Sequence, residues 1–537
     1  MARAVIQPPY FPIIYVRGYA GTEGEIEDTV ADPYMGFNVG TTKIRQVWTG
    51  AISRHYFESP VVRLMKQHGY SDVYTDGEDM PGHEAIPSRS IVVFRYYDEV
   101  STAFGSGERT PIERFGEELG ELILRLRQRV CGDDPAALKA FKVYLVGHSM
   151  GGLIIRCMLQ NGKLGSNAEH RQRLAEARRL VDKVFTYASP HNGIDFQIIG
   201  NVPAILTAND VNNFNRPRMA GYLGLPTKGP AAAKEVHSLN GAFDPDRFFC
   251  LIGTNSLDYA VANGWSSRAV GPYSDGLVRI NNAFVTGPSG QPDNPVRLAP
   301  RAYVHRSHSG HFGIVNSEEG YQNLTRFLFG DVRVDGVLDV HSLSLPGSVE
   351  KRRAAGEKVR ASYHFEAIAR VRGVHWDLSR RVASEHSTVF RRYDELFPNP
   401  NKPADPSVRP HHERPHLFTA FLSSGARVEK RRRSLGFSLD LGVLVPTYEV
   451  DGVLWLKDHY DGGYIYRDKI NLEAIPPGGD QPQWRLRFGF DSRTPNRVTM
   501  EAQPLVGPEA IEFRIPVEQN SSPGITASLV LTARSWN

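Results

Sequence analysis

The pattern of hydrophobic and polar positions changes character near residue 335. Before it, short apolar runs of strand length alternate with segments whose apolar residues recur every three or four positions. After it, apolar and polar residues alternate at every second position. The first pattern is typical of an α/β domain with a mostly parallel sheet, and the second predicts antiparallel strands with one buried face. We therefore expect an α/β domain over residues 1–335 and an all-β, sandwich-like accessory domain over 336–537.

Particular segments carry the two patterns. The buried strands expected in the first part are Phe11–Val16, Ser90–Tyr97, Phe141–Val146, Val181–Tyr187 and Arg247–Ile252. Helices are expected over Arg114–Val130 and Gly152–Leu159. The period-2 strands expected in the second part are Val359–Val371, Trp484–Phe490, Ile511–Val517 and Ile525–Ala533. Six prolines over Pro398–Pro415 predict a long loop inside that domain.

Composition and charge exclude several classes of protein. Hydrophobic residues make up 41% of the 537 residues, and the formal net charge is only +4, so nothing favours a disordered chain or a nucleic-acid partner. The three cysteines are too sparse for a disulfide scaffold or a Cys-based zinc site. We expect no metal and no cofactor. No apolar run is long enough to span a membrane and no secretory signal is evident, so we expect a cytoplasmic protein, or one exported without a recognisable signal peptide.

One short motif carries chemistry. The predicted strand Phe141–Val146 runs directly into Gly147-His148-Ser149-Met150-Gly151, and a helix is expected to follow. In a sharp strand-to-helix turn the serine backbone is strained and both neighbours are crowded, so small residues are needed two positions before and two after it. Gly147 and Gly151 meet this need. Ser149 is therefore the candidate nucleophile.

At this motif the sequence resembles the α/β-hydrolase superfamily, and within it the bacterial lipases and esterases. The resemblance spans most of residues 10–330. It rests on the motif and on three further stretches, Ile13–Gly21, Ala188–Gly193 and Ser274–Val278. In the first stretch Arg17 stands where lipases usually carry His before Gly. The resemblance implies that the backbone amides of Tyr19 and Met150 form an oxyanion hole.

The resemblance also implies an acid and a histidine downstream of Ser149, in that order along the chain. The Ser-Asp-Gly-Leu-Val stretch makes Asp275 the preferred acid, with Asp258 as its rival. For the histidine, His311 is preferred because it follows Gly310 and precedes the last predicted helix of the domain; His308 is the alternative. His148, inside the motif, is interpreted as a packing residue.

The function that these residues imply is a serine hydrolase of carboxylic esters with lipid-like acyl groups. Ser149, His311 and Asp275 would form its triad and act through an acyl-enzyme. A phospholipase or thioesterase with the same triad is an alternative, because the triad does not determine the leaving group. A different class of alternative is a non-catalytic protein that binds its partner through the β domain.

Three other features suggest further hypotheses. Residues 195–246 form a lid-like insertion in which Phe196, Ile199, Val202 and Leu206 recur at helical spacing. Residues 351–433 hold 19 basic and 9 acidic side chains, which gives either an ordinary solvated face or peripheral contact with an anionic membrane surface. The segment His412–His416 matches the zinc-protease pattern H-E-x-x-H, but Pro415 would break the helix which that pattern requires, so no zinc site is expected.

Overall fold

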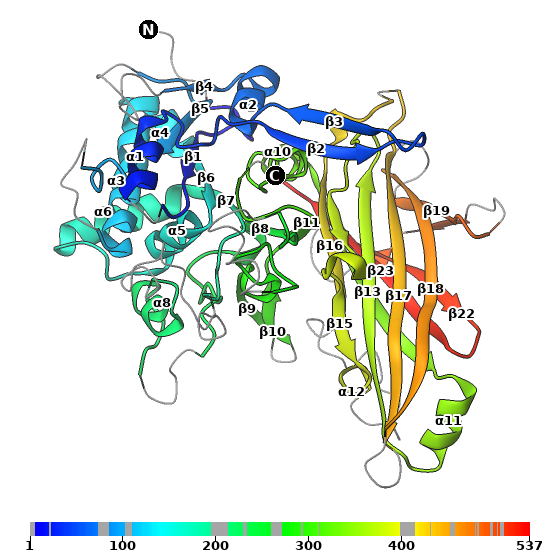
Figure 1. Ribbon diagram of the computed structural model, residues 1–537. Coiled ribbons are helices and arrows are strands. Elements are labelled where there is room, and N and C mark those ends of the chain that lie inside the picture. Colours follow the sequence, from blue (N-terminus) through cyan, green and yellow to red (C-terminus); the bar gives the residue numbers. More distant parts are fainter. Residues whose placement is uncertain are drawn as a thin grey trace. The chain divides into compact units, whose positions relative to one another are not determined.

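The structure is a computed structural model of the whole chain (Figure 1). It describes residues 6–20, 23–73, 85–102, 110–194, 213–228, 234–258, 271–291, 294–310, 312–397, 414–429, 431–451, 457–477, 480, 483–493, 498–501, 503–504 and 510–537. None of the helices within these ranges is both long enough and apolar enough to cross a lipid bilayer.

The chain forms two compact units. The first comprises Met1–Ser289, Val296–Arg301 and His305–Phe329, and the second comprises Gly290–Pro295, Ala302–Val304 and Gly330–Asn537. Strand β12, Val332–Ser344, crosses residue 335 without interruption. The boundary predicted after residue 335 therefore falls inside β12, and the last continuous stretch of the second unit begins earlier, at Gly330.

A seven-stranded sheet has the order β11-β8-β7-β6-β1-β5-β4; its strands from β8 to β4 are the centre of the first unit, whereas of β11 only Arg301 is assigned to that unit. The strands are β1 (Ile13–Val16), β4 (Ser71–Asp72), β5 (Ser90–Phe94), β6 (Val143–His148), β7 (Val181–Tyr187), β8 (Phe248–Gly253) and β11 (Arg301–Val304). Every pairing from β4 to β8 is parallel. All five predicted strands are present. The predicted α/β class is confirmed.

The central strand shows why the sequence pattern was informative. All four residues of β1 are buried, and β1 pairs with β5 on one side and with β6 on the other. A parallel strand covered on both faces has no polar side to expose, so it appears in the sequence as a continuous apolar run. The short strands β4 and β11 at the two edges of the sheet were not predicted.

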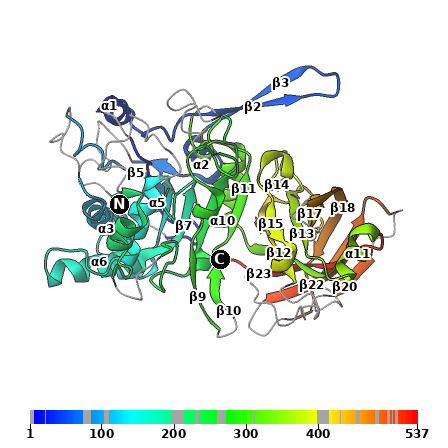
Figure 2. The same ribbon diagram turned by 60° about the horizontal axis from the view of Figure 1, so that its bottom comes forward.

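Helices cover both faces of this sheet (Figures 1 and 2). Phe185 of β7 lies against Phe327 of α10, with ring centroids 6.0 Å apart, whereas its neighbour Thr186 lies close to Gly152 of α5. Successive side chains of a strand point to opposite faces, so α5 and α10 lie on opposite faces. The helices of this unit are α1 (Glu23–Ala31), α2 (Pro60–His68), α3 (Ile112–Cys131), α4 (Pro135–Ala140), α5 (Met150–Gln160), α6 (Ala168–Leu180), α8 (Arg216–Tyr222) and α10 (Glu318–Phe329).

The described residues also form two two-stranded sheets. One is the antiparallel hairpin of β2 (Thr41–Gln46) with β3 (Ile52–Phe57) in the first unit, and the other is the pair of β9 (Thr286–Gln291) with β10 (Asn294–Leu298), of which Gly290–Pro295 is assigned to the second unit. The apolar helix expected around Phe196–Leu206 lies outside the described residues, so the lid-like insertion stays a prediction.

The second unit contains two antiparallel sheets with a common hydrophobic core, as the period-2 pattern predicted. One sheet has the order β16-β12-β23-β22-β21, and the other has the order β14-β13-β17-β18-β19-β20 with β15 also paired to β13. Leu338 of β12, Phe365 of β13 and Leu529 of β23 belong to the same buried cluster, which joins the two sheets. The inward-facing positions of both sheets therefore fill one core.

The four strands predicted for this part correspond to β13, β19, β22 and β23, and the other strands of the second unit were not predicted. The strands that follow β12 are β13 (Val359–Val371), β14 (Ser379–Arg381), β15 (Val389–Arg392), β16 (His416–Leu422), β17 (Leu435–Asp451), β18 (Lys457–Ile475), β19 (Arg485–Phe490), β20 (Val498–Glu501), β21 (Gln503–Pro504), β22 (Ala510–Gln519) and β23 (Gly524–Ser535), with helices α11 (Gly347–Ala354) and α12 (Tyr393–Leu396). His416 opens strand β16, whereas His412 lies outside the described residues. A strand at His416 does not provide the helix that the zinc pattern requires.

A charged cluster lies on β12. The Asp335 carboxylate is 2.8 Å from the Arg333 guanidinium and 3.6 Å from that of Arg534, and it accepts a 2.6 Å hydrogen bond from the Thr419 hydroxyl. Burial alone would raise the pKa of Asp335, but Arg333 and Arg534 outweigh it and lower this pKa to about 2.

The cluster predicts a pH dependence of stability. Because the folded-state pKa of Asp335 lies below its unfolded value, its contribution is complete above about pH 5 and is lost as the pH falls toward 2. Asp335→Asn should therefore lower the free energy of unfolding less at low pH than at neutral pH. Its difference from the wild type should shrink by about 1 kcal/mol between about pH 6 and about pH 3. Urea unfolding of the variant and the wild type at both pH values measures this difference. Asp461→Asn, an exposed acid of β18, is the control, and an equal cost of Asp335→Asn at both pH values would contradict the assignment.

Candidate active site

The turn between β6 and α5 is strained at Ser149. This residue has φ 50° and ψ −121°, a backbone conformation that residues other than glycine rarely adopt. Its amide donates to the Tyr187 carbonyl at 3.0 Å, and its carbonyl accepts from the Gly152 amide at 3.1 Å. Bonds on both sides of the turn hold the strained backbone, as the strand-to-helix motif predicts.

Close backbone approach explains the glycines of this turn. A Cβ at Gly151 would stand 2.2 Å from the Val16 carbonyl oxygen, and one at Gly147 would stand 2.8 Å from the Gly152 amide nitrogen. Gly18 is equally confined, since its Cβ would stand 2.9 Å from the Ser149 Cβ. The end of β1 therefore lies directly against the turn that carries the serine.

Three side chains form a hydrogen-bonded chain at this turn. His308 Nε2 is 3.0 Å from Ser149 Oγ, and His308 Nδ1 is 2.9 Å from Asp275 Oδ2. All three residues are buried, with at most 4% of the histidine and aspartate side chains exposed. A carboxylate can only accept, so Nδ1 carries the proton and Nε2 is left to accept one from the serine hydroxyl.

Asp275 is fixed by the turn that contains it. Its Oδ1 accepts from the amides of Leu277 at 3.0 Å and Val278 at 2.7 Å, which leaves Oδ2 for the histidine. Its main-chain carbonyl also accepts from the His308 amide at 2.9 Å. The rival Asp258 bonds instead to the Asn255 side-chain amide at 2.6 Å. The structure thus brings Asp275 to His308 and uses Asp258 within a local turn.

The preferred histidine of the sequence analysis must be corrected. The imidazole between Ser149 and Asp275 belongs to His308, whereas His311 lies outside the described residues. The loop after β11 folds back at once, through the His308 amide bond to Asp275 and a bridge between Ser307 and Gly313. Because the chain turns this early, the fourth residue after β11 already reaches the serine.

His148 has a larger part than packing. Its Nε2 lies 3.0 Å from the His308 carbonyl oxygen, which can only accept, so the neutral ring donates from Nε2. Burial, followed by the nearby His308, lowers the pKa of His148 well below its usual value and keeps the ring neutral. His148 therefore ties the loop that carries His308 to the turn that carries Ser149.

Two tyrosines after β5 support the loop at Arg17–Ala20. The Tyr96 hydroxyl donates to the Arg17 carbonyl at 2.9 Å, and the Tyr97 hydroxyl donates to the Gly18 carbonyl at 3.1 Å while accepting from the Ala20 amide at 2.6 Å. The sequence analysis missed both. Their only signal was a pair of aromatic residues directly after a buried strand. The Arg17 side chain bonds to the Met35 carbonyl.

Tyr19 and Met150, the predicted oxyanion pair, line one cavity. Its volume is about 200 Å³. Met150 is the first residue of α5, where the helix leaves amides without intrahelical acceptors. The other residues that line the cavity are mostly apolar: Ala20, Ile26, Tyr97, Val100, Thr110, Pro111, Ile112, Phe115, Asn213 and Arg218.

No family model matches the chain, and no curated protein matches it in sequence. Solved structures of hydrolases align with it at low identity and low TM-score. The mature form of the lipase BlEst2 from Bacillus licheniformis aligns with 61% of this chain and 94% of its own, at 16% identity and a TM-score of 0.30. The propeptide form of that lipase aligns with 85% and 98%, at 11% identity and a TM-score of 0.27. A cell surface hydrolase from Lactobacillus plantarum aligns with 60% and 91%, at 12% identity and a TM-score of 0.20.

The confined backbone at the turn gives a test of the fold around the site. Gly151→Ala should lower the free energy of unfolding by about 3 kcal/mol or more, because its Cβ would overlap two main-chain carbonyls that cannot move independently. Gly162→Ala, where nothing lies within 4 Å of the added Cβ, is the matched control. Urea midpoints compare the two. Equal midpoints would show that β1 does not approach the turn this closely.

The two histidines can be separated by the reactivity of the serine. His308→Gln should slow labelling of Ser149 by a fluorophosphonate about 1,000-fold, because the hydroxyl loses the base that takes its proton. His311→Gln should change the rate less than about 3-fold. Mass spectrometry of the labelled peptide over time measures both rates. A large effect of His311→Gln with normal labelling in His308→Gln would restore the original assignment.

Proposed function

We propose that the protein is a serine hydrolase that cleaves carboxylic esters with lipid-like acyl groups. The observation that carries the proposal is the buried hydrogen-bonded chain of Ser149, His308 and Asp275 on a strained turn. A structural role would not require a serine at an unfavourable φ with an imidazole aligned on its hydroxyl.

The geometry supports the following acylation step. His308 Nε2 accepts the Ser149 hydroxyl proton as Oγ attacks the ester carbonyl carbon, and Asp275 stabilises the imidazolium through Nδ1–H. The carbonyl oxygen becomes an oxyanion that the amides of Tyr19 and Met150 would stabilise. When the tetrahedral intermediate collapses, the bond to the alcohol oxygen breaks and His308 gives its proton to that oxygen. The acyl group stays on Ser149.

Water completes the cycle by the same groups. His308 takes a proton from a water molecule as the water oxygen attacks the acyl carbon. It then returns a proton to the Ser149 oxygen as the carboxylic acid leaves. His148 holds the backbone of His308 and Tyr97 holds that of Gly18, so the base and the oxyanion loop keep their places through both halves. No metal is needed at any step.

The cavity beside Met150 suggests the size of the acyl group. Its volume of about 200 Å³ is below the range of pockets that enclose drug-sized ligands. Ile26, Val100 and Phe115 on its wall favour a hydrocarbon chain over a charged one. We therefore expect short or medium acyl chains to be preferred.

A panel of p-nitrophenyl esters of graded acyl length tests the proposed function. The protein should hydrolyse short and medium esters without added metal, and Ser149→Ala should lower kcat/KM at least about 1,000-fold. Adding a thioester and a phospholipid to the panel distinguishes the alternative leaving groups.

The control for this experiment is Ser166→Ala, a change at an exposed serine outside the site, which should leave kcat/KM unchanged. Turnover that survives in Ser149→Ala would overturn the proposal. Absence of turnover on the whole panel, with no labelling of Ser149 by a fluorophosphonate, would favour a binding protein instead.

A further inference from the structure

The hairpin of β2 and β3 is a two-stranded arm of the first unit (Figure 2). Its turn closes through bonds from the Gly50 amide to the Val47 carbonyl at 2.8 Å and from the Val47 amide to the Ala51 carbonyl at 2.9 Å. Gly50 has φ +83°, which suits glycine. In β3 the side chains of Ile52, Arg54 and Tyr56 are exposed, whereas those of Ser53, His55 and Phe57 on the other face are partly buried.

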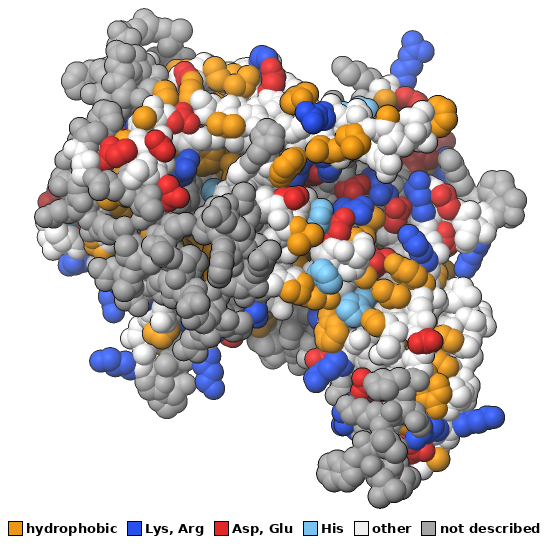
Figure 3. Space-filling model, in the orientation of Figure 1, with side chains coloured by type: hydrophobic (Ala, Val, Ile, Leu, Met, Phe, Trp, Pro, Cys, Tyr) orange, Lys and Arg blue, Asp and Glu red, His pale blue; other side chains and the backbone are white. Residues whose placement is uncertain are grey.

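One face of this arm carries exposed apolar side chains next to polar ones. The register pairs Thr42 with Tyr56, Ile44 with Arg54 and Gln46 with Ile52, so these side chains share a face. Ile44 is 50% exposed, Ile52 70% and Tyr56 74%, and Trp48 in the turn is 97% exposed. The space-filling view shows apolar side chains beside basic ones over the arm (Figure 3).

The concentration of these residues is unusual for the first unit. Among its described residues, the large hydrophobic side chains classed as exposed are Val39, Ile44, Val47, Trp48, Ile52, Tyr56 and Leu257. All but Leu257 lie on the arm or directly before it. Single exposed apolar residues are normal, whereas a gathered set marks a surface that binds something.

The charge of the arm indicates what it binds. Between Thr41 and Phe57 the sequence has Lys43, Arg45 and Arg54, and no Asp or Glu. Arg54 lies on the face with the exposed apolar side chains, opposite Ile44, whereas Arg45 lies on the other face, and both are exposed. Exposed aromatic and aliphatic side chains next to cations suit the headgroup region of an anionic lipid surface, where the rings enter the interface and the cations meet phosphates.

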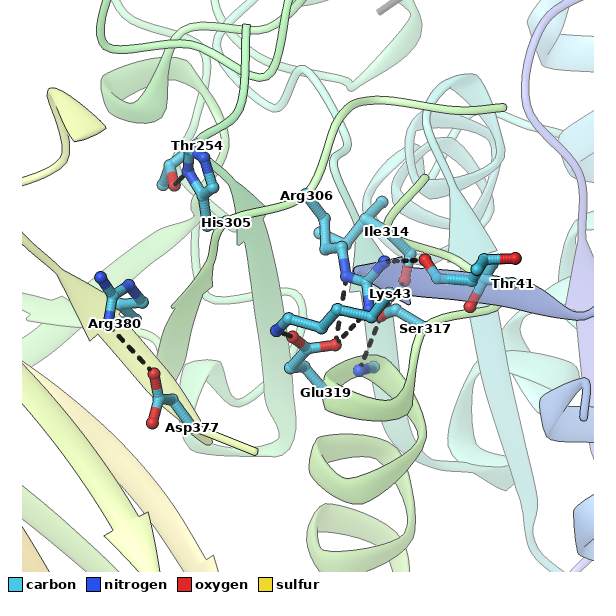
Figure 4. A network of polar contacts seen from close by, with 12 residues as sticks. Thr41, Lys43, Thr254, His305, Arg306, Ile314, Ser317, Glu319, Asp377 and Arg380 are labelled. Carbon is cyan, nitrogen blue, oxygen red and sulfur yellow. Dashed lines mark hydrogen bonds and ion pairs between the residues drawn. The ribbon is translucent and has the colours of Figure 1, made fainter. Parts of the chain in front are cut away.

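The foot of the arm is bonded to the segment that carries His308, the candidate catalytic base (Figure 4). Glu319 is buried and pairs with Lys43 of β2 and with Arg306 at 2.9 Å, and Arg306 also donates to the Thr42 carbonyl at 3.2 Å. Burial alone would raise the pKa of Glu319, but Arg306 and Lys43 outweigh it and lower this pKa. Since Arg306 is two residues before His308, these contacts join the arm to the segment that carries His308.

The basic stretches of the second unit are less suited to this task. Arg352 pairs with Glu357, Arg353 with Glu350 at 2.6 Å, and Arg432 with Glu429 at 2.7 Å. A cation that already has a carboxylate beside it attracts an anionic surface weakly. Several of the basic residues over 351–433 are therefore already paired with carboxylates.

We propose that the β2–β3 arm docks the protein on an anionic lipid surface, with Trp48, Ile52 and Tyr56 entering the interface. The inference deepens the proposed function, since lipid-like esters are met at such surfaces. The docking itself needs no turnover, so it is measured in the Ser149→Ala protein.

Vesicle sedimentation tests the docking. Ser149→Ala protein should sediment with vesicles of phosphatidylcholine that contain about 30% phosphatidylglycerol at about 0.05 M salt, and much less at about 0.5 M salt. Adding Trp48→Ser with Ile52→Ser should reduce the bound fraction at least about 10-fold. Adding Arg45→Gln with Arg54→Gln should lower the affinity about 10-fold or more at low salt.

Matched variants keep the test specific. Leu257→Ser removes another exposed apolar residue, and Lys139→Gln with Lys163→Gln removes two other exposed charges; neither should change binding. Thermal unfolding should be equal in all of these proteins. In the Ser149 background, the arm variants should hydrolyse a soluble ester like the wild type, so loss of docking is distinguishable from failure of the proposed chemistry.

Three results would overturn the proposal. The intact protein could stay in the supernatant at low salt, or Trp48→Ser with Ile52→Ser could bind as well as Leu257→Ser. The third result is self-association that depends on Trp48 in sedimentation velocity without vesicle binding, which would assign the arm to a second copy of the chain.

Discussion

The close approach of two main-chain segments, the end of β1 and the first turn of α5, is the constraint on which the site depends. Neither Gly18 nor Gly151 has room for a Cβ. At Gly151 the space is occupied by the main chain at the end of β1, and at Gly18 it is occupied by His148 and Ser149. This contact lets a strained Ser149 stand between a parallel strand and a helix N-terminus, beside the loop of Tyr19. Side chains then hold what the backbone has brought together: Tyr97 fixes the loop and His148 fixes the loop of His308. Buried polar groups that are fully bonded stabilise one arrangement and make the alternatives costly.

Features with a local cause could be predicted from the sequence. The strand Val181–Tyr187 and the strand Val359–Val371 have the predicted ends, because burial on both faces or on one face leaves a direct pattern of apolar residues. The turn at Ser149 was predictable for the same reason, since its crowding demands glycines at fixed offsets. Asp275 could be preferred over Asp258 only through resemblance to lipases.

Features that depend on contacts distant in sequence could not be predicted. Nothing in residues 305–313 indicates where the chain turns back, because that is decided by the bond from the His308 amide to the Asp275 carbonyl, 33 residues away in the chain. His311 was favoured by its place before the last helix, but position along the chain does not determine which histidine side chain lies beside Ser149. The domain boundary was misplaced because β12 begins before the change in hydrophobic period becomes visible.

The distribution of charge shows why net charge says little about what this surface binds. Residues 336–537 carry the chain's formal excess of basic residues, yet Arg370 lies between Asp377 and Asp440 and Arg380 pairs with Glu385. The field of such pairs falls off quickly in salt water. The β2–β3 arm contributes fewer cations, but no Asp or Glu lies between Thr41 and Phe57, and Lys43 pairs with the buried Glu319 at the foot of the arm. A small arm that presents Arg45 and Arg54 to solvent together with exposed apolar side chains therefore has more potential for an anionic interface than a larger region in which many charges are already paired.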